Sequence, residues 1–378
     1  MAKVHTLNFK EEKNQILLES ESKKNLQKVV LYHNTQKNKI YPIFSKILHL
    51  IVFEFILLLL PKMILLDNYT EYIQVTYRDG NISKYIPSSS INDVYKQEIV
   101  SVLIYNLTNF PMNNMFSNFI NLKSVSYEIY CKGQFNIGNM EGIFSGCSSL
   151  ESFTLTDVYS SHKNDAIKMT NMFYRCQNLI SVTFNNELKV SDINHMFDSC
   201  SSLVSVDLSK LKSDDSLDLT DTFINCRNLK SITFGSFKVG NMTNIELNSN
   251  VIEYIDLSKM RSDDEIDMSG LFNGYRNLKT VEGDFKNIFV GNTNEMFYNC
   301  YSLTSISFKP EKINSNINMT KMFYNCSSIQ TIELSTKGGS TQLTPVDMSE
   351  MFYNCVNLMR LSISNFKTDK LNNMTYML

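Results

Sequence analysis

The sequence lacks most of the patterns by which enzymes and metal proteins are recognised. Its 378 residues contain no tryptophan, and the five histidines (His5, His33, His49, His162 and His195) show no ligand or triad spacing. There is no H-E-x-x-H, no G-x-S-x-G and no phosphate-cradling glycine loop. The eight cysteines form no C-x-x-C pair, which argues against zinc. We therefore expect no catalytic residues, no metal and no cofactor.

A strong charge of one sign is also missing. The net charge is −2, from 36 basic and 38 acidic residues, so no basic field for nucleic acid is expected. The balance conceals an uneven distribution, because residues 1–46 hold nine lysines against four glutamates, a net of +5. The rest of the chain must then carry −2 − 5 = −7.

One long apolar run, ILHLIVFEFILLLL, occupies residues 47–60 and continues past Pro61 and Lys62 to Leu66. This length is enough to span a membrane. Glu54 counts against a span, since an acidic residue at the centre costs about 2.5–3.5 kcal/mol. The lysines on its amino side predict a transmembrane signal-anchor over residues 44–66, with residues 1–43 as a basic cytoplasmic tail. The alternative is a buried helix or a mispredicted gene start.

The remainder of the chain is repetitive. The peptide MFYNC occurs at residues 296–300, 322–326 and 351–355, and looser copies extend the series in both directions. The copies begin at residues 115, 143, 172, 196, 222, 245, 271, 296, 322, 351 and 377. A period near 26 residues, kept over ten units, identifies a repeat architecture.

The first half of each unit has a helical pattern. Met319, Met322, Phe323 and Cys326 are spaced i, i+3, i+4 and i+7, which predicts a two-turn helix. An Asn or Asp precedes the first of these positions in nine of eleven copies, and we predict that it is a helix N-cap worth about 1 kcal/mol. These residues are Asn139, Asp192, Asp218, Asn241, Asp267, Asn292, Asn318, Asp347 and Asn373.

The second half of each unit has the pattern of a strand, with apolar residues such as Leu203, Val206 and Leu208 at j, j+3 and j+5. One helix–strand unit cannot bury both of its apolar faces, whereas a stack of units shares a core. Variable stretches such as residues 212–215 and 335–340 follow the strands, and we expect them to be surface loops. The prediction is an α/β solenoid of about ten helix–strand units over residues 112–378, with a parallel sheet on one side.

Residues 67–111 are expected to cover the first repeat. Residues 72–77 alternate between apolar and polar, Asp79-Gly80 follows, and a second run begins at Ile82, which together predict a hairpin. Residues 99–105 are then expected to form the strand that begins the sheet.

The L-x-x-[IV]-x-[LF] strand and the 20–29-residue period resemble leucine-rich repeats. The fuller form M-x-x-M-F-x-x-C-x-x-L-x-x-I-x-F is similar to the BspA-type (DUF285) repeats of bacterial and protist surface proteins, and the similarity covers residues 112–378. This resemblance implies a cell-surface protein that binds partners through the concave sheet face, and it implies no catalytic residues. The long basic tail and an end in mid-repeat, at residues 373–378, depart from the family pattern.

Seven cysteines, all except Cys131, occupy the same repeat position. A free cysteine behaves as a small hydrophobe, so we interpret these residues as core spacers. Disulfides between adjacent units are the alternative, and Cys131 is the candidate free thiol. The methionines at the repeat starts are interpreted as core filler, and a catalytic role for His195 is not expected.

Polar side chains alternate with the apolar residues of the strands. The candidate binding face comprises Ser181, Thr183, Ser205, Asp207, Ser231, Thr233, Tyr254, Asp256, Ser305 and Ser307. These residues form a shallow, hydroxyl-rich and mildly acidic surface suited to a protein or glycan. The alternative is that Ser and Thr merely tolerate a solvated sheet.

Two functions remain. The first is a single-pass plasma-membrane protein whose extracellular repeats bind a protein or glycan, with the membrane crossed by residues 44–66. The second is a cytoplasmic scaffold for protein–protein interaction, in which the apolar segment is packed as a helix. An enzyme is disfavoured, because no convergent polar cluster is evident.

Overall fold

The fold comes from a computed structural model, in which residues 72–85, 98–105, 112–128, 139–155, 166–240, 242, 245, 247–337 and 342–378 are described. The chain divides into two compact units, residues 1–69 and 70–378, and every described residue belongs to the second. The expected basic tail at 1–43 and membrane segment at 44–66 therefore lie outside the described residues.

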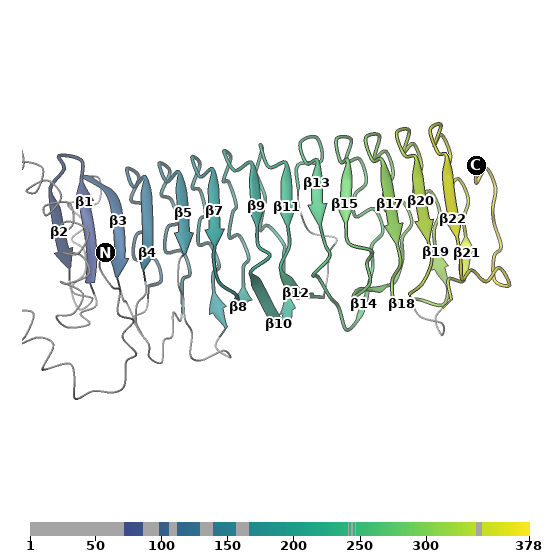
Figure 1. Ribbon diagram of the computed structural model, residues 1–378, viewed down its shortest axis with the longest axis horizontal. Helices are drawn as coiled ribbons and strands as arrows, with labels where there is room; N and C mark the ends of the chain where they lie inside the picture. Colours follow the sequence, from purple (N-terminus) through teal and green to yellow (C-terminus); the bar gives the residue numbers. More distant parts are fainter. Residues whose placement is uncertain are drawn as a thin grey trace, which may run out of the picture. The chain divides into compact units, whose positions relative to one another are not determined.

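Each repeat forms one coil of a β-solenoid, with a turn segment, a first strand and, in most coils, a short second strand (Figure 1). The array has about nine parallel coils. The first strand row consists of β3 (Ile99–Tyr105), β4 (Ser124–Glu128), β5 (Ser152–Leu155), β7 (Ser181–Phe184), β9 (Ser205–Asp207), β11 (Ser231–Thr233), β13 (Tyr254–Asp256), β15 (Thr280–Glu282), β17 (Ser305–Phe308), β20 (Thr331–Leu334) and β22 (Arg360–Ile363).

The second strand row is formed by residues that follow the first strands. It consists of β6 (Ile167–Lys168), β8 (Leu188–Asp192), β10 (Leu211–Leu217), β12 (Ser236–Val239), β14 (Glu265–Ile266), β16 (Phe289–Val290), β18 (Lys312–Ile313), β19 (Ile317–Asn318) and β21 (Pro345–Asp347). Each row is divided into several sheets, and every strand pairing from β3 to β4 onward is parallel, as expected when every coil turns in the same sense.

The prediction that residues 212–215 form a surface loop is wrong, because they lie in β10. Leu211, Ser213 and Leu217 are buried, while Asp214 and Asp215 are exposed. The pairing with β12 also jumps from Lys212 to Ser216, so the acidic pair lies at a bulge. The apolar residues at both ends thus hold the stretch in the second row.

The amino-terminal part of the array forms an antiparallel cap. β1 (Tyr72–Tyr77) pairs with β2 (Ile82–Tyr85) on one side and with β3 on the other, both antiparallel. β3 then pairs in parallel with β4. The hairpin and the strand that begins the sheet are confirmed by this pairing.

The predicted helices are absent from the described residues, where each M-x-x-M-F-x-x-C segment is a chain of tight turns. In the coil that begins at Met169, the N–H groups of Met172 and Cys176 donate to the carbonyls three residues earlier, Met169 and Phe173, at 3.1 and 3.0 Å. Asn171 adopts a left-handed φ of 57°, which no α-helix accommodates. The apolar residues at i, i+3, i+4 and i+7 therefore lie on successive tight turns and not on a helix.

The missing helical hydrogen bonds are replaced by bonds between coils. Alternate N–H groups in this segment donate to the next coil, as Phe173 does to the Met196 carbonyl at 2.9 Å and Arg175 does to Asp198 at 2.8 Å. Stacked coils satisfy buried backbone groups in this way, and an isolated helix offers its neighbour no such donors. The tertiary stack thus overrides the local helical pattern.

The residues predicted as N-caps accept backbone hydrogen bonds as predicted, but each stands at the start of a turn segment and not of a helix. The side-chain oxygens of Asn139, Asp192, Asp218, Asp267, Asn292, Asn318, Asp347 and Asn373 accept the backbone N–H two residues later at 2.8–3.3 Å. These contacts are Asx-turns, which start a turn as readily as a helix. Asn241 lies outside the described residues.

The core runs through the array as stacked identical residues. Phe116, Phe144, Phe173, Phe197 and Phe223 stack in sequence, and Phe272, Phe297, Phe323 and Phe352 form a second series, with centroids 5.3–5.9 Å apart. The methionines that begin these segments are mostly buried, which agrees with their interpretation as core filler.

Candidate partner-binding face

The ten predicted binding residues lie on the outward side of the first strand row, here called the strand face. Six of them are aligned on one sheet, where Ser205, Ser231 and Tyr254 are register partners and Asp207, Thr233 and Asp256 are the next set. Ser181 and Thr183 lie on β7 and pair with β5, and Ser305 and Ser307 lie on β17 and pair with β20. The structure thus groups the ten residues on three sheets of one row.

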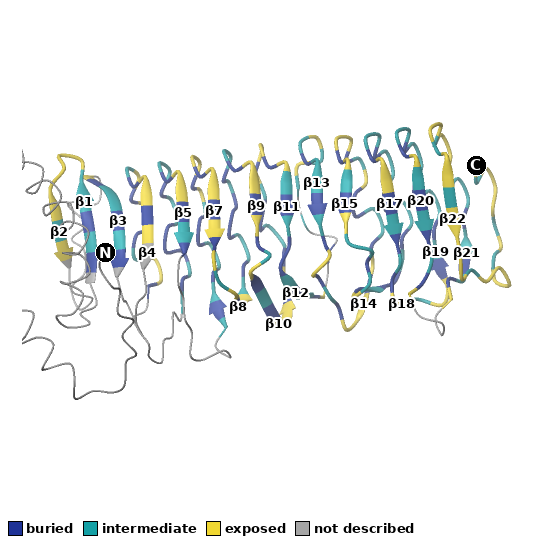
Figure 2. Cartoon of the chain, viewed as in Figure 1, coloured by how far each residue is buried: buried dark blue, intermediate teal, exposed yellow. Residues whose placement is uncertain are grey.

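Burial alternates along these strands (Figure 2). Ser181, Thr183, Ser205, Asp207 and Ser305 are exposed, whereas Ser231, Thr233, Tyr254, Asp256 and Ser307 are half-buried. The apolar residues between them, such as Val206 and Ile232, are almost completely buried. This inside–outside alternation is the one the sequence predicted.

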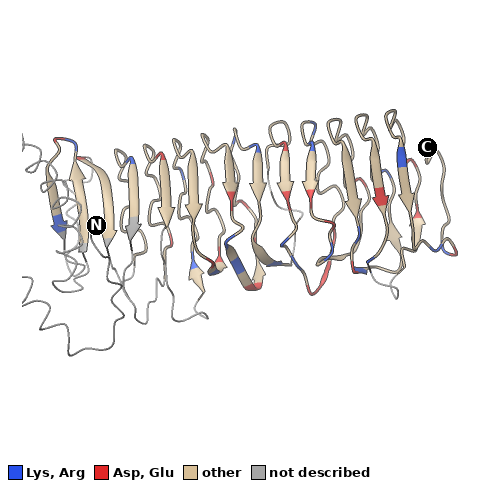
Figure 3. Ribbon diagram, viewed as in Figure 1, with Lys and Arg blue, Asp and Glu red and all other residues tan. Residues whose placement is uncertain are grey.

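The middle of the strand face is acidic (Figure 3). Asp207 and Asp256 end β9 and β13, and Glu282 is the register partner of Asp256 on β15. The Oδ1 atoms of Asp207 and Asp256 accept the N–H groups of Ser209 and Ser258, each at 2.8 Å. One oxygen of each aspartate thus holds a turn, and its second oxygen has no basic partner among the described residues.

Tyr254 is the only aromatic member of the predicted set, and it lies beside these carboxylates. Partial burial raises the pKa of Tyr254, and the negative charges of Asp256 and Glu282 raise it further. Its hydroxyl therefore remains protonated at neutral pH and can donate a hydrogen bond to a partner.

Further along the row, carboxylates are neutralised. Glu333 on β20 contacts Lys309 at 2.6 Å, and this lysine holds the pKa of Glu333 below its usual range. Glu253, just before β13, contacts Lys230 at 3.1 Å and Lys279 at 2.7 Å. The predicted set omitted these lysine–glutamate contacts, although Lys230, Glu253 and Lys279 directly precede β11, β13 and β15 in the sequence.

The seven repeat cysteines are free, and their thiols form a second ladder. Each Sγ donates to the phenylalanine carbonyl of the preceding coil at 3.0–3.1 Å, as Cys200 does to Phe173 and Cys226 to Phe197. Burial raises the pKa of Cys147 and Cys226 to about 12, so almost no thiolate forms at neutral pH. These residues are core spacers that also join coils, and Cys131 lies outside the described residues.

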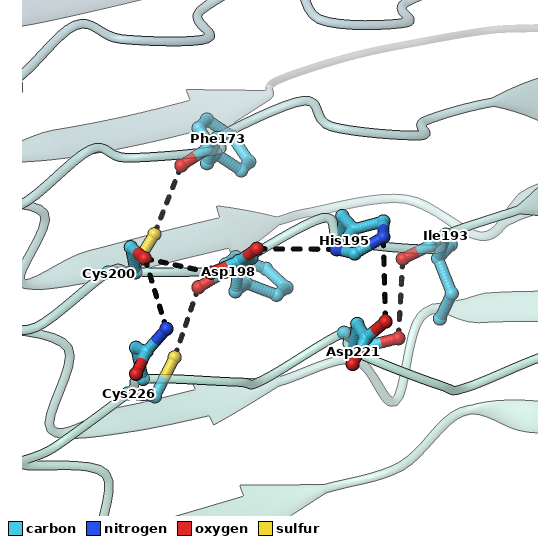
Figure 4. A network of polar contacts seen from close by, with 11 residues as sticks. Phe173, Ile193, His195, Asp198, Cys200, Asp221 and Cys226 are labelled. Carbon is cyan, nitrogen blue, oxygen red and sulfur yellow. Dashed lines mark hydrogen bonds and ion pairs between the residues drawn. The ribbon is translucent and has the colours of Figure 1, made fainter. Parts of the chain in front are cut away.

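His195 lies at a turn between carboxylates (Figure 4). Its Nδ1 is 3.3 Å from Oδ2 of Asp198, and its Nε2 is 3.6 Å from Oδ2 of Asp221 in the next coil. The nearby Ser199 hydroxyl donates to Asp198 at 2.8 Å rather than to the imidazole, so no base faces a nucleophile. The cluster links two coils and has no catalytic geometry.

Neither a metal centre nor a membrane span is found in the part of the chain that the structure describes. Those residues contain no group of three or more potential His, Cys, Asp or Glu ligands. They also include no helix with the length and apolar character needed to cross a bilayer. The apolar segment at 44–66 is not among them.

Parallel coils with a strand row, a ladder of buried residues and an Asx-turn at each start define a leucine-rich-repeat solenoid. The chain belongs to the BspA-type leucine-rich-repeat family, which matches six copies over residues 112–249 and 268–377. Members of this repeat family are generally non-enzymatic binding domains, typical of surface binding proteins. No curated protein matches the chain.

Two solved structures are similar to the chain at low identity. A leucine-rich repeat protein from Bacteroides ovatus is 16% identical, with 79% of this chain and 89% of that one covered and a TM-score of 0.26. The TLR13–ssRNA13 complex is 13% identical, with 73% of this chain covered and a TM-score of 0.25. The match spans only 45% of that second chain, and neither likeness bears on what this protein binds.

Proposed function

We propose that this protein is a single-pass cell-surface binding or adhesion protein whose strand face recognises an extracellular protein or glycan. The observation that carries this proposal is the register of the polar side chains, which form continuous rows across neighbouring parallel strands. Adjacent strands are about 4.8 Å apart, so a partner that crosses the strands meets a hydroxyl or carboxylate at every step.

The chemistry of the face suits hydrogen bonding more than apolar contact. Thr183, Ser205 and Ser305 offer exposed hydroxyl groups. Tyr254 adds a half-buried ring that can pack against a sugar or an apolar side chain. Such a polar surface supplies specificity through matched donors and acceptors. The family's typical role in surface binding supports the same function.

The surface location rests on the sequence, where the +5 charge of residues 1–46 precedes the apolar run. Antibody staining of intact cells tests it, and we expect signal from the repeats without permeabilisation. Signal only after permeabilisation would favour the intracellular scaffold instead. Extraction of membranes with alkaline carbonate should leave the chain in the pellet.

Binding through the strand face is tested with Ser205→Ala/Asp207→Ala in the full chain. We expect capture of glycans on an array, or of purified extracellular proteins, to fall about tenfold, which corresponds to about 1.4 kcal/mol. Asp215→Ala/Ser216→Ala is the matched control, since it changes the same residue types at exposed positions of the same coil on β10. An equal loss of capture in both variants, or no loss in either, would exclude the strand face as the binding surface.

A further inference from the structure

The residue directly before each first strand belongs to a further row, which borders the strand face and is here called the border row. Backbone hydrogen bonds align this row between coils, since the N–H of Ile180 donates to the Glu151 carbonyl at 2.9 Å and that of Lys230 to the Val204 carbonyl at 2.8 Å. From β4 to β15 the border row consists of Lys123, Glu151, Ile180, Val204, Lys230, Glu253 and Lys279.

Two branched aliphatic side chains lie exposed in the middle of the border row. Ile180 is 54% exposed and Val204 is 44% exposed. Their coils are neighbours, because β7 and β9 lie side by side and contact each other (Figure 1). The other five members of the row are charged. An apolar pair rimmed by charged residues is typical of the centre of a protein contact.

The charges on the two sides of this apolar pair are of opposite sign. Glu151, one coil before it, is exposed and makes no ion pair among the described residues. Lys230, one coil after it, has a side chain that is 56% exposed. Lys230 and Lys279 share the single carboxylate of Glu253, at 3.1 and 2.7 Å, so one of the two positive charges is not neutralised. The order along the row is therefore acidic, apolar, apolar, basic.

This order is complementary to its own reverse. A second copy of the chain can face the first through a two-fold axis that runs parallel to the strands, between β7 and β9. Such an axis reverses the order of the coils and keeps the direction of the strands. Glu151 then faces Lys230 of the second copy, and Ile180 faces Val204 of the second copy. Because the contact is two-fold, each of these pairs occurs twice.

The polar rows of the strand face fit the same arrangement. The axis places Ser181 opposite Ser205 of the second copy, and Thr183 opposite its Asp207. Thr183 and Asp207 are exposed. The Oδ1 atom of Asp207 accepts the Ser209 N–H at 2.8 Å, and its Oδ2 can accept the Thr183 hydroxyl. The short Ser and Thr side chains let two sheet faces approach each other closely.

We propose that the strand face binds a second copy of this chain, in an antiparallel two-fold contact centred on Ile180 and Val204. The inference rests on the proposed function and names its partner, since the protein that the strand face recognises is then the same chain. Charge complementarity selects this occupant, because the acidic–apolar–basic order and its reverse are carried by one surface. A small and mostly polar contact is weak, and many copies on one surface strengthen it by avidity.

The test measures self-association of the full chain, purified in detergent. Half of the sample carries a donor dye at the amino terminus and half an acceptor dye, and energy transfer is followed as the concentration rises. We expect saturable transfer for the wild type. Glu151→Lys and Lys230→Glu should each weaken it about tenfold, because each variant puts like charges opposite each other at two places.

A mixture of the two variants tests the two-fold register. Donor-labelled Glu151→Lys and acceptor-labelled Lys230→Glu again place opposite charges at both contacts, so their pairing should return to within about threefold of the wild type. The double variant Glu151→Lys/Lys230→Glu should recover in the same way. Asp215→Lys is the matched control, because Asp215 is exposed on β10, outside the strand face, and makes no ion pair. It should associate like the wild type.

Three results would each overturn the proposal: no saturable transfer in the wild type, unchanged association of both single variants, or no recovery in their mixture. Capture of a glycan or of another protein separates this outcome from the proposed function. If Ser205→Ala/Asp207→Ala loses such capture while the wild type does not self-associate, the strand face is a binding surface and its partner is not a second copy.

Discussion

At the scale of single residues, the repeat cysteine has two roles that only the stacked coil makes visible. Its thiol fills a small core position and also donates to a carbonyl of the preceding coil. The pattern of buried, evenly spaced cysteines was readable from the sequence, because a free cysteine behaves as a hydrophobe. The hydrogen bond was not, since its acceptor lies about one repeat away and depends on the stacking geometry.

The thiols should therefore differ in reactivity according to burial. Cys355 is half-buried and burial raises its pKa to about 11, whereas the more deeply buried Cys147 and Cys226 are raised to about 12. Since the thiolate is the nucleophile, we expect iodoacetamide at pH 8 to alkylate Cys355 well before those two. Mass mapping of tryptic peptides checks the order, and urea-unfolded protein, in which all react alike, is the control. Equal alkylation rates for the three cysteines in the native protein would contradict the different burial of their thiols.

The Asx-turn residues predict a dependence of stability on pH. Hydrogen bonds from the side chain and the N–H of Thr220 lower the pKa of Asp218, outweighing its partial desolvation, and His195 adds a small effect in the same direction. A carboxyl with a lowered folded-state pKa stabilises the fold above its unfolded pKa of about 3.9, and this contribution is lost as pH falls through the folded value.

We therefore expect Asp218→Ala to lower the free energy of unfolding by about 1 kcal/mol at pH 7, with less effect at pH 3. Asp218→Asn is the matched control, because Asn139 and Asn318 make the same turn at equivalent positions without titrating. Urea denaturation at both pH values measures the difference. A loss that is the same at pH 3 and pH 7 would show that the charged carboxylate is not what caps the turn.

At the scale of elements, the sequence predicted the first strand row correctly and the helices wrongly for one physical reason, and the second strand row was not predicted. Strands such as β9 and β11 show alternation that depends only on which side of the coil is buried. The spacing of Met319, Met322, Phe323 and Cys326 buries the same residues whether the backbone is helical or a series of turns. A helix and a series of turns differ in the acceptors to which the backbone N–H groups donate, and a single sequence does not reveal those acceptors.

The candidate site was predictable to a similar extent. The outward residues of the strand face follow from alternation, so all ten predicted positions lie on it. The local bonds of Asp207 and Asp256 and the lysine partners of Glu253 depend on neighbouring coils. One irregular unit is readable from the sequence, since Glu246 and Ser249 occupy its phenylalanine and cysteine positions.

A glycine substitution discriminates turn from helix. Lys321 has a left-handed φ of 55°, which costs an ordinary residue about 1 kcal/mol and glycine almost nothing. We expect Lys321→Gly to raise the free energy of unfolding by about 1 kcal/mol, whereas glycine within a helix would lower it by a similar amount. Lys321→Ala keeps the left-handed strain and removes the weak contacts of the lysine with Glu350 and with the Tyr324 ring, which Lys321→Gly removes as well, so it serves as control. Urea denaturation of the wild type and the two variants gives the sign of the change in the free energy of unfolding.

At the scale of the whole array, stability is approximately a sum of contributions from single coils and from the interfaces between neighbouring coils. One weak interface therefore divides the array into two cooperative parts. The coil around Ile245 is such a place, because within the part of the chain that the structure describes the phenylalanine stack ends at Phe223 and resumes at Phe272. The Phe223 N–H also donates to no carbonyl of the next coil among the described residues, while β11, β13 and β15 remain paired. At this junction the strand side is therefore continuous, and the described turn side is interrupted.

We expect the two parts, residues 112–229 and 268–378, to open as separate cooperative blocks in native-state hydrogen exchange at increasing urea concentration. Glu246→Phe/Ser249→Cys should make them open together, because a continued stack and thiol ladder restores the interface on the turn side. Phe297→Ala is the control, since it weakens the second block by about 3–5 kcal/mol without repairing the junction. A wild-type protein whose two blocks already open at one urea concentration would show that the paired strands alone carry the coupling across the break.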